Sequence, residues 1–192
     1  MSGSTVRKVD QDENDENCLT LGGAMRPGTG THRVSFVRES KYHSILFLGV
    51  VQDGAPHDAD PAGQKMNHQH SSNNSDSRGS KDSRSCTLEQ HCGWFMHAHN
   101  GSLWGNGMEE VAPAGQVRAG HILTLELDTD AVPMKLTFWL DGKRHGPGYD
   151  ELIVEAGAGG SALQDGPGAL RWAVSLFNEG CAVSVVPDPE LQ

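Results

Sequence analysis

The sequence predicts an all-β fold: an antiparallel β-sandwich that carries one long polar loop insertion. Three observations lead to this prediction. Many short segments are apolar or alternate apolar with polar residues, turn residues separate them, and no stretch shows a convincing 3.6-residue period. The 24 glycines and 9 prolines among 192 residues also favour many turns over long helices. A chain of this length fits one domain and can bury a substantial core.

The first half of the chain contains two expected strands after a polar start. Residues 1–17 are rich in Asp and Glu and are expected to form a flexible acidic tail, because they offer little apolar surface to bury. Residues 32–37 alternate, which puts Val34 and Phe36 on one face. Residues 44–51 form a continuous apolar run, typical of a strand that is buried on both faces.

Residues 52–85 differ in composition from the segments around them. They are rich in Ser, Asp, Asn, His, Gln and Gly, and Met66 is their only large apolar residue. We interpret this stretch as a low-complexity insertion loop between two strands of one sandwich. A linker between two domains is the alternative, but the preceding residues alone are too few to fold stably. One domain is therefore expected over residues 18–187, with a C-terminal tail at 188–192.

The second half is dense in predicted strands. Residues 121–128 and 135–140 both alternate, and their inward residues are expected to be Leu123, Leu125 and Leu127 in the first and Leu136, Phe138 and Leu140 in the second. Asp141-Gly142 then supplies a tight turn. Leu170, Trp172, Val174 and Leu176 share a face, and Asn178-Glu179-Gly180 fits a three-residue hairpin loop that leads into residues 181–186.

Charge and cysteine usage limit the class of partner and the compartment. The net charge of −10 argues against nucleic acid or an anionic membrane surface as the main partner, because both require clustered Lys and Arg. The longest apolar run is only strand-sized, and the first residues lack the apolar stretch of a secretory signal. The four cysteines are irregularly spaced. We therefore expect reduced thiols and a cytoplasmic location.

Residue types alone suggest two further kinds of site. His97 and His99 would point to the same face of a strand, as two zinc ligands do. Cys92 would point to the opposite face of that strand, so surface histidines are the simpler interpretation. Trp104 lies beside an Asn-Gly turn and could be either core or a sugar platform, whereas Trp94, Trp139 and Trp172 are expected in the core. A metal- or carbohydrate-binding sandwich is therefore the alternative function. No cofactor is expected, and no acid–base pair or activated nucleophile can be placed.

The order of the short motifs resembles the SPRY domain family between Leu19 and Pro187. The matching segments are Gly30-Thr31-His32, Leu48-Gly49-Val50, Gly93-Trp94, Leu103-Trp104-Gly105-Asn106-Gly107, Gly120-His121-Ile122 through Asp128, Leu136-Thr137-Phe138-Trp139-Leu140-Asp141-Gly142, and Arg171-Trp172-Ala173-Val174-Ser175. The resemblance implies a β-sandwich of concanavalin-like type that binds and does not catalyse. It implies a protein-interaction module that recognises a short peptide or loop of a partner protein. We expect this module to be a monomeric adaptor.

The resemblance also implies where the partner would bind. Domains of this family bind ligands with loops gathered at one end of the sandwich, and loops on a rigid scaffold are where binding residues concentrate. By matched position, the expected binding residues are Arg26, Pro27, Gly28 and Thr29, joined on the same surface by Phe177 and Asn178. Arg26 would donate hydrogen bonds to the peptide, and Phe177 would serve as an apolar anchor.

Overall fold

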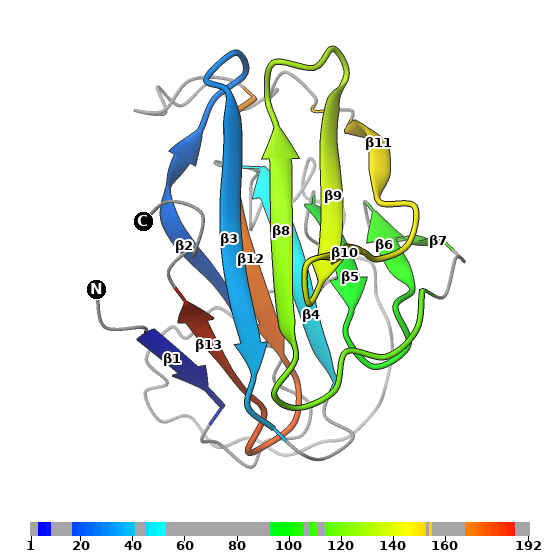
Figure 1. The fold of residues 1–192 in the computed structure, drawn as a ribbon. Coiled ribbons are helices and arrows are strands. Elements are labelled where there is room, and N and C mark those ends of the chain that lie inside the picture. Colours follow the sequence, from blue (N-terminus) through cyan, green and yellow to red (C-terminus); the bar gives the residue numbers. More distant parts are fainter. Residues whose placement is uncertain are drawn as a thin grey trace, which may run out of the picture.

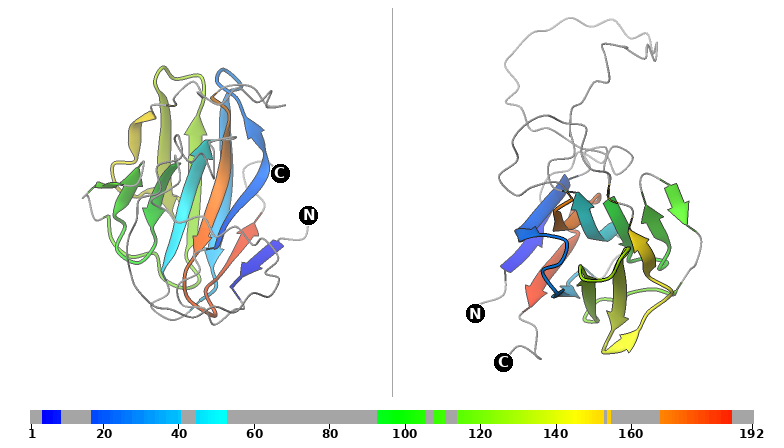
Figure 2. Two further views of the ribbon diagram at one scale, coloured as in Figure 1. Left: turned by 180° about the vertical axis from the view of Figure 1, so that it is seen from behind. Right: turned by 90° about the horizontal axis from the view of Figure 1, so that it is seen from above.

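Two antiparallel sheets pack face to face in the computed structural model of the chain (Figures 1 and 2). The structure describes residues 4–8, 17–40, 45–52, 93–105, 108–110, 114–152, 154 and 168–186. None of these residues is helical, and accordingly this part of the chain holds no helix that is long and apolar enough to cross a membrane. The predicted fold class, an antiparallel β-sandwich, is confirmed.

Sheet A faces the viewer in Figure 1 and contains both predicted alternating strands of the second half. Its order is β1 (Ser4–Arg7), β13 (Ala182–Val186), β3 (Thr31–Arg38), β8 (Ile122–Asp128), β9 (Met134–Leu140) and β10 (Lys143–Arg144), and β11 (Tyr149–Leu152) also pairs with β9. The central register places Val34 opposite Leu125, and Leu125 opposite Phe138. Every pairing in this sheet is antiparallel.

Sheet B forms the second layer and is seen from outside in the left view of Figure 2. Its order is β2 (Asn17–Met25), β12 (Leu170–Leu176), β4 (Leu46–Gln52), β5 (Gly93–His97), β6 (Leu103–Gly105) and β7 (Met108–Glu110). Strand β4 requires a glycine at position 49, because a Cβ there would lie 2.0 Å from the carbonyl oxygen of Trp94 on β5. The neighbouring strand therefore approaches β4 closely at this point.

The main core lies between the two sheets and follows the predicted alternation. Leu123, Leu125 and Leu127 of β8 are all fully buried, as are Leu136 and Phe138 of β9. From sheet B the core receives the four predicted side chains of β12, Leu170, Trp172, Val174 and Leu176, together with Leu46, Leu48, Val50, Trp94 and Met96. The predicted inward faces of these strands are confirmed, and Leu140 packs against the core while partly buried.

A second, smaller apolar cluster lies on the outer face of sheet B. Its buried members are Phe47, Val51, Phe95 and Ala173, with Cys18, Trp104 and Phe177 packed against them. These residues alternate along their strands with the members of the main core. Every residue of β4 is therefore buried, which confirms the prediction of a strand buried on both faces.

The turns follow the predicted residue types. Asp141 and Gly142 both have positive φ angles, 49° and 76°, in the hairpin between β9 and β10. Gly180 has a φ of 74° in the loop that leads from β12 to β13. Hairpin turns of this kind need left-handed backbone, which Gly, Asn and Asp adopt most readily. The motif pattern therefore located both turns correctly.

The N-terminal prediction is wrong in part. Residues 1–17 were expected to form a flexible tail, yet Ser4–Arg7 form β1, and Val6 of β1 pairs with Val183 of β13. Lys8 is buried, and its ammonium group donates a hydrogen bond of 2.7 Å to the carbonyl oxygen of Phe177. The acidic composition averaged over the segment concealed Val6 and its short strand, which pairs at the edge of sheet A. The sequence also missed β2, whose glycines weaken a strand pattern, and β11.

Some sequence predictions fall on residues outside the described ranges. These are the insertion at 52–85 except Gln52 and the C-terminal tail at 188–192. Gln52 itself is the last residue of β4 and is buried.

Candidate functional site

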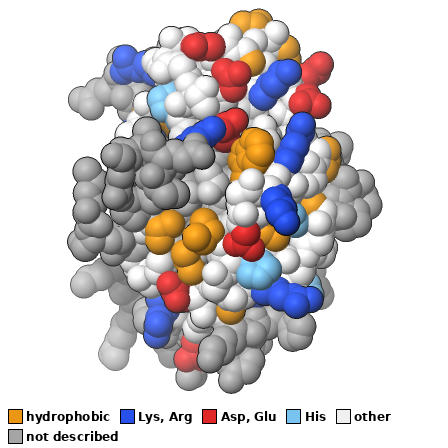
Figure 3. Space-filling model, in the orientation of Figure 1, with side chains coloured by type: hydrophobic (Ala, Val, Ile, Leu, Met, Phe, Trp, Pro, Cys, Tyr) orange, Lys and Arg blue, Asp and Glu red, His pale blue; other side chains and the backbone are white. Residues whose placement is uncertain are grey.

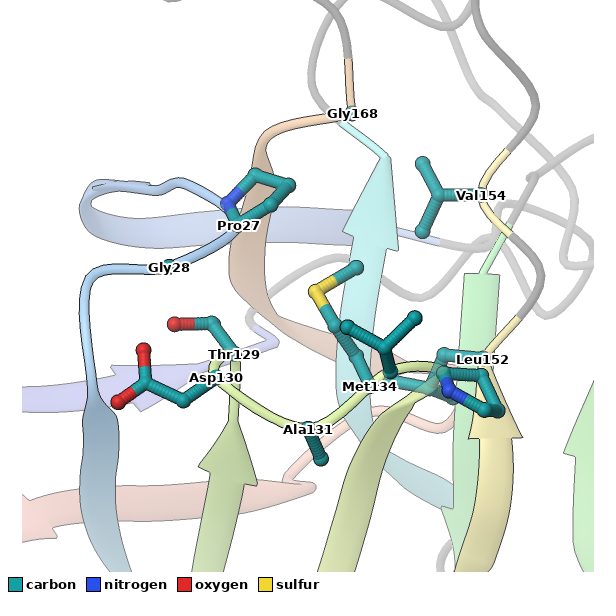
Figure 4. Close-up of a pocket in the computed structure, with 11 residues that line it drawn as sticks. Pro27, Gly28, Thr129, Asp130, Ala131, Met134, Leu152, Val154 and Gly168 are labelled. Atoms are coloured by element: carbon teal, nitrogen blue, oxygen red, sulfur yellow. The ribbon is translucent and has the colours of Figure 1, made fainter.

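A cavity of about 460 Å³ opens at one end of the sandwich, between the β2–β3 loop, the β8–β9 loop and the segments that flank β11 and β12 (Figure 4). We call this the pocket end, which lies at the top of Figure 1. The described lining residues are Pro27, Gly28, Thr129, Asp130, Ala131, Val132, Pro133, Met134, Leu152, Val154 and Gly168. Its volume lies within the range of about 300–1,000 Å³ that is usual for ligand sites.

Backbone hydrogen bonds hold the first two loops together. The amide of Gly28 donates to the carbonyl of Thr129 at 2.8 Å, and the amide of Thr129 donates to the carbonyl of Gly30 at 3.1 Å. The buried Thr129 hydroxyl adds two more contacts, because it donates to the Gly30 carbonyl at 2.7 Å and accepts from the Thr29 amide at 3.1 Å. This wall of the pocket is therefore fixed by a network in which each partner is satisfied.

Two aspartates shape the β8–β9 loop. Oδ1 of Asp128 accepts hydrogen bonds from the amides of Asp130 and Ala131, at 3.0 and 3.1 Å, which forms an Asx-type turn. Oδ1 of Asp130 accepts from the amide of Gly30 at 3.0 Å. The loop is thus closed on itself by Asp128 and tied to the neighbouring loop by Asp130.

The opposite wall is positioned from sheet B. The hydroxyl of Tyr149 donates a hydrogen bond of 2.9 Å to the carbonyl of Phe95, which anchors the start of β11 across the sandwich. Leu152 ends β11, and Val154 lies just beyond it. Gly168 has a φ of 83°, and a Cβ there would lie 3.6 Å from Pro27 and 3.7 Å from Val154. Its backbone therefore lies between these two side chains.

The interior of the pocket is mainly apolar. Figure 4 shows the thioether of Met134 pointing into the space between Pro27 and Val154. Val132, two residues before Met134, is 97% exposed and is the most exposed of the large hydrophobic side chains in the described part of the chain. Among the described lining residues, Asp130 alone has an ionisable side chain. An apolar cavity with one charged group at its edge suits an amphipathic ligand group.

The predicted residues of the β2–β3 loop lie at this end. Pro27 and Gly28 line the pocket, and Thr29 lies in the same loop. The Thr29 hydroxyl donates to the Arg26 carbonyl at 2.6 Å and lies 2.7 Å from Nε2 of His32. Arg26 is exposed and precedes Pro27, but it is not a lining residue.

Phe177 and Asn178 lie at the opposite end, so the prediction that all six residues share one surface is wrong. Met25 pairs with Leu170 at the start of β12, whereas Leu176 at its end pairs with Asn17. Six residue steps of about 3.3 Å separate these points, which amounts to about 20 Å. Both loops flank strands of sheet B, but they emerge from opposite ends of it (Figure 1).

Phe177 and Asn178, at that opposite end, which we call the hairpin end, make contacts within the protein. The Phe177 ring lies 5.5 Å from the Phe47 ring in the outer cluster. Oδ1 of Asn178 accepts a hydrogen bond of 2.7 Å from the amide of Ile45. The expected apolar anchor is therefore a packing residue, and the expected polar contact joins two segments of the same chain.

One ionisable group near the hairpin end has a shifted pKa. Burial lowers the pKa of Arg38, and the nearby Cys181 opposes this shift. The guanidinium donates a hydrogen bond of 2.6 Å to the carbonyl of Val117, which compensates part of the desolvation. Arg38 thus serves the structure of the domain.

The residues behind the alternative functions have structural contacts of their own. His97 stacks on Phe47 with ring centroids 4.6 Å apart, and Nδ1 of His99 lies 3.2 Å from Nε2 of Gln116. Within the described ranges no group of three or more His, Cys, Asp or Glu side chains could hold a metal ion, and Cys92 falls outside those ranges. Trp104 packs edge-on against Phe47, and its indole N–H donates to the Ser102 hydroxyl at 3.0 Å.

The outer face of sheet A carries charges of both signs. In Figure 3, Lys and Arg side chains are interspersed with Asp and Glu over the face formed by β3, β8 and β9. One such pair is Arg33 with Glu126, joined by a hydrogen bond of 2.6 Å. Trp139, expected in the core, is instead half-buried on this face. A mixed face lacks the continuous positive field that attracts a nucleic-acid backbone.

Sequence reasoning missed most of the pocket lining. The residues it did not name are Thr129, Asp130, Ala131, Val132, Pro133, Met134, Leu152, Val154 and Gly168. One signal was present, because residues 129–134 lie between two correctly predicted strands and so had to form a loop at one end of the sandwich. The pairing of β3 with β8, which brings that loop against the β2–β3 loop, depends on tertiary contacts between distant segments.

Comparisons with known proteins relate the fold to two SPRY domains. The SPRY domain of human HERC1 is 14% identical over 92% of this chain and 85% of that one, with a TM-score of 0.55. A second human SPRY domain is 13% identical over 96% and 92%, also with a TM-score of 0.55. No protein-family model matches the sequence, and no curated protein proved similar to it.

These likenesses define the class of fold. The chain is a β-sandwich of SPRY-like, concanavalin-like type, as the order of its motifs predicted. The carbohydrate recognition domain of Emp46p, in its potassium-bound form, superposes less well, with 11% identity over 95% and 85% of the two chains and a TM-score of 0.46. A TM-score of that size does not bear on function.

Proposed function

We propose that this protein is a non-catalytic interaction module that binds a short peptide or loop of a partner protein in the cavity at the pocket end. The single observation that carries the proposal is an apolar cavity of about 460 Å³ formed by loops on a rigid sandwich. Loops positioned by a scaffold are where binding residues concentrate. A cavity of this size accommodates one large side chain and part of a peptide backbone.

The proposal assigns a role to each element of the site. Met134 and Leu152 form the apolar floor, and both are buried in the core, so the floor is preorganised. Val132 provides an exposed apolar contact at the rim. Arg26 and Thr29, beside the pocket, would hydrogen-bond the peptide backbone, for which a guanidinium has five N–H donors. A rigid site loses little conformational entropy on binding.

The test compares two exposed apolar residues at different places. Peptides that bind the full chain are selected from a displayed library of random nine-residue peptides, and their affinities are then measured for two variants, Val132→Asp and Ile122→Asp. Ile122 is a matched control, because it is 41% exposed and lies on the outer face of β8 near the hairpin end. Val132→Asp is expected to weaken binding at least about 10-fold, as at an interface hot spot.

The same experiment can contradict the proposal. If both variants bind the selected peptides as the parent does, the pocket end is not the binding site. If only Ile122→Asp loses affinity, the outer face of sheet A is the site instead. Denaturation curves of both variants accompany the measurement, and each is expected to lie within about 0.5 kcal/mol of the parent because both positions are exposed.

We also propose that the module acts as a monomeric adaptor in the cytoplasm. In the described part of the chain, the exposed large hydrophobic residues Leu19, Ile45, Ile122 and Val132 lie on four different segments and do not gather into one patch. Scattered apolar residues are normal on monomers, whereas stable self-association needs a contiguous surface. Light scattering on the purified chain tests the monomer, and localisation of a fluorescently tagged chain tests the compartment.

A further inference from the structure

We propose that the pocket selects peptides in which a large apolar residue lies next to a lysine or arginine. This inference rests on the proposed function, because it names the chemistry of the ligand for the same cavity. The observation behind it is the juxtaposition of an apolar cavity with one carboxylate, that of Asp130. The apolar residue of the peptide would fill the cavity, and the basic residue would pair with Asp130.

The carboxylate of Asp130 is held in place and yet can accept further hydrogen bonds. Its Oδ1 accepts from the amide of Gly30 at 3.0 Å, which fixes the side chain against the β2–β3 loop. The residue is exposed, and within the described ranges its other oxygen has no hydrogen-bond or ion-pair partner. A carboxylate can accept about four hydrogen bonds, so a lysine or arginine can add to this arrangement without breaking it.

Asp128 and Arg26, the neighbouring charged residues of these two loops, do not line the cavity. Asp128 uses its Oδ1 to cap the loop, and it lies opposite Lys135 in the β8–β9 register. Arg26 precedes the lining residue Pro27 but does not line the cavity itself. Asp130 is therefore the one charged group among the described lining residues, and the net charge of −10 also favours a basic ligand.

The neighbours of Asp130 in the β8–β9 loop supply the apolar contacts to the peptide. Val132 is two residues further along the loop and is 97% exposed, and Met134 points into the cavity. A partner side chain that enters between them is desolvated on several sides, which is the usual setting of a binding hot spot. The adjacent residue of the peptide would then lie near the rim, within reach of Asp130.

The expected selectivity is modest because the ion pair would be exposed. Exposed pairs contribute little in water, so a basic neighbour should improve affinity about 2- to 5-fold over an alanine neighbour. An acidic neighbour should weaken binding by a similar factor. Both effects should shrink as salt is added, since exposed charges are screened over about 10 Å at 0.1 M salt.

The experiment measures binding of the full chain to an array of nine-residue peptides with Leu at the centre and Gly or Ser at the outer positions. The two residues that flank Leu are varied among Lys, Arg, Ala and Glu. Binding is measured for the parent, Asp130→Asn and the matched control Asp141→Asn. Asp141 is also exposed and also accepts a backbone hydrogen bond, from Ile122 at 2.9 Å, but it lies at the hairpin end.

The proposal expects the parent and Asp141→Asn to prefer Lys and Arg beside Leu, and expects Asp130→Asn to lose that preference while it still binds Leu peptides. Binding without a basic preference, or a preference that Asp130→Asn retains, would overturn this inference and leave the proposed function intact. If no Leu peptide binds more tightly than an all-Gly/Ser peptide, and replacing Leu with Phe, Ile or Met gives the same result, then the proposed function fails with it.

Discussion

At the pocket end of the sandwich, two loop side chains face outward beside a cavity, whereas at the hairpin end the corresponding contacts close the fold. Val132 is 97% exposed, and one oxygen of Asp130 has no partner in the described part of the chain. At the hairpin end, Asn178 accepts a hydrogen bond from Ile45, and the buried Lys8 donates one to the carbonyl of Phe177. Polar side chains bond to backbone groups at both ends, and the pocket end differs because an exposed apolar residue and one carboxylate oxygen remain beside a cavity.

This contrast indicates which loop residues are available for function. A side chain that satisfies a backbone group of its own chain contributes to stability, and its removal costs folding energy. A side chain that projects beside a preorganised cavity contributes little to folding, so it can be used for binding. The two ends are therefore expected to separate in experiment, with changes at the hairpin end affecting stability and changes at the pocket end affecting affinity.

The largest effect should come from the core that connects the two ends. Phe138 is fully buried and faces the opposite sheet. Phe138→Ala is expected to lower the free energy of unfolding by about 3–5 kcal/mol, because it removes a large side chain and leaves a cavity. Thr137→Ala, half-buried on the outer face of the same strand, should cost less than about 1 kcal/mol. Chemical denaturation of both variants that gave equal losses would contradict the register of β9.

A smaller effect on stability is expected at the hairpin end. Phe177 is half-buried against Phe47 in the outer cluster, so Phe177→Ala should lower the free energy of unfolding by about 1–3 kcal/mol. Phe177→Leu should recover most of this loss, because it keeps an apolar side chain in the same place. Affinity for peptides selected on the parent should stay unchanged for both variants. A folded Phe177 variant with weakened peptide binding would restore this residue to the binding surface.

The sequence predicted the sandwich better than it predicted the site. Alternation along β8, β9 and β12 reports which face of a strand is buried, and this information is local. The site depends on which loops meet at one end, and that depends on long-range pairings such as β3 with β8. Pro27 and Gly28 line the cavity, whereas Phe177, expected on the same surface, lies at the opposite end, because motif order does not specify strand direction in space.

The smallest effect is expected at Arg26. A charged residue at the pocket end can bind the backbone of the peptide, or it can interact with the charges of the peptide's side chains. Arg26 is exposed beside the pocket, so Arg26→Ala should change stability by less than about 0.5 kcal/mol. If its guanidinium donates to peptide carbonyls, affinity should fall about 3- to 10-fold by the same factor for every peptide, because all peptides share those carbonyls. Asp130→Asn should instead alter only the preference between basic and acidic neighbours.

Titrations of Arg26→Ala with matched Lys- and Glu-flanked Leu peptides test whether Arg26 binds the peptide backbone. Unequal losses would mean that Arg26 acts through its charge on the side chains of the peptide, and unchanged affinities would remove Arg26 from the site.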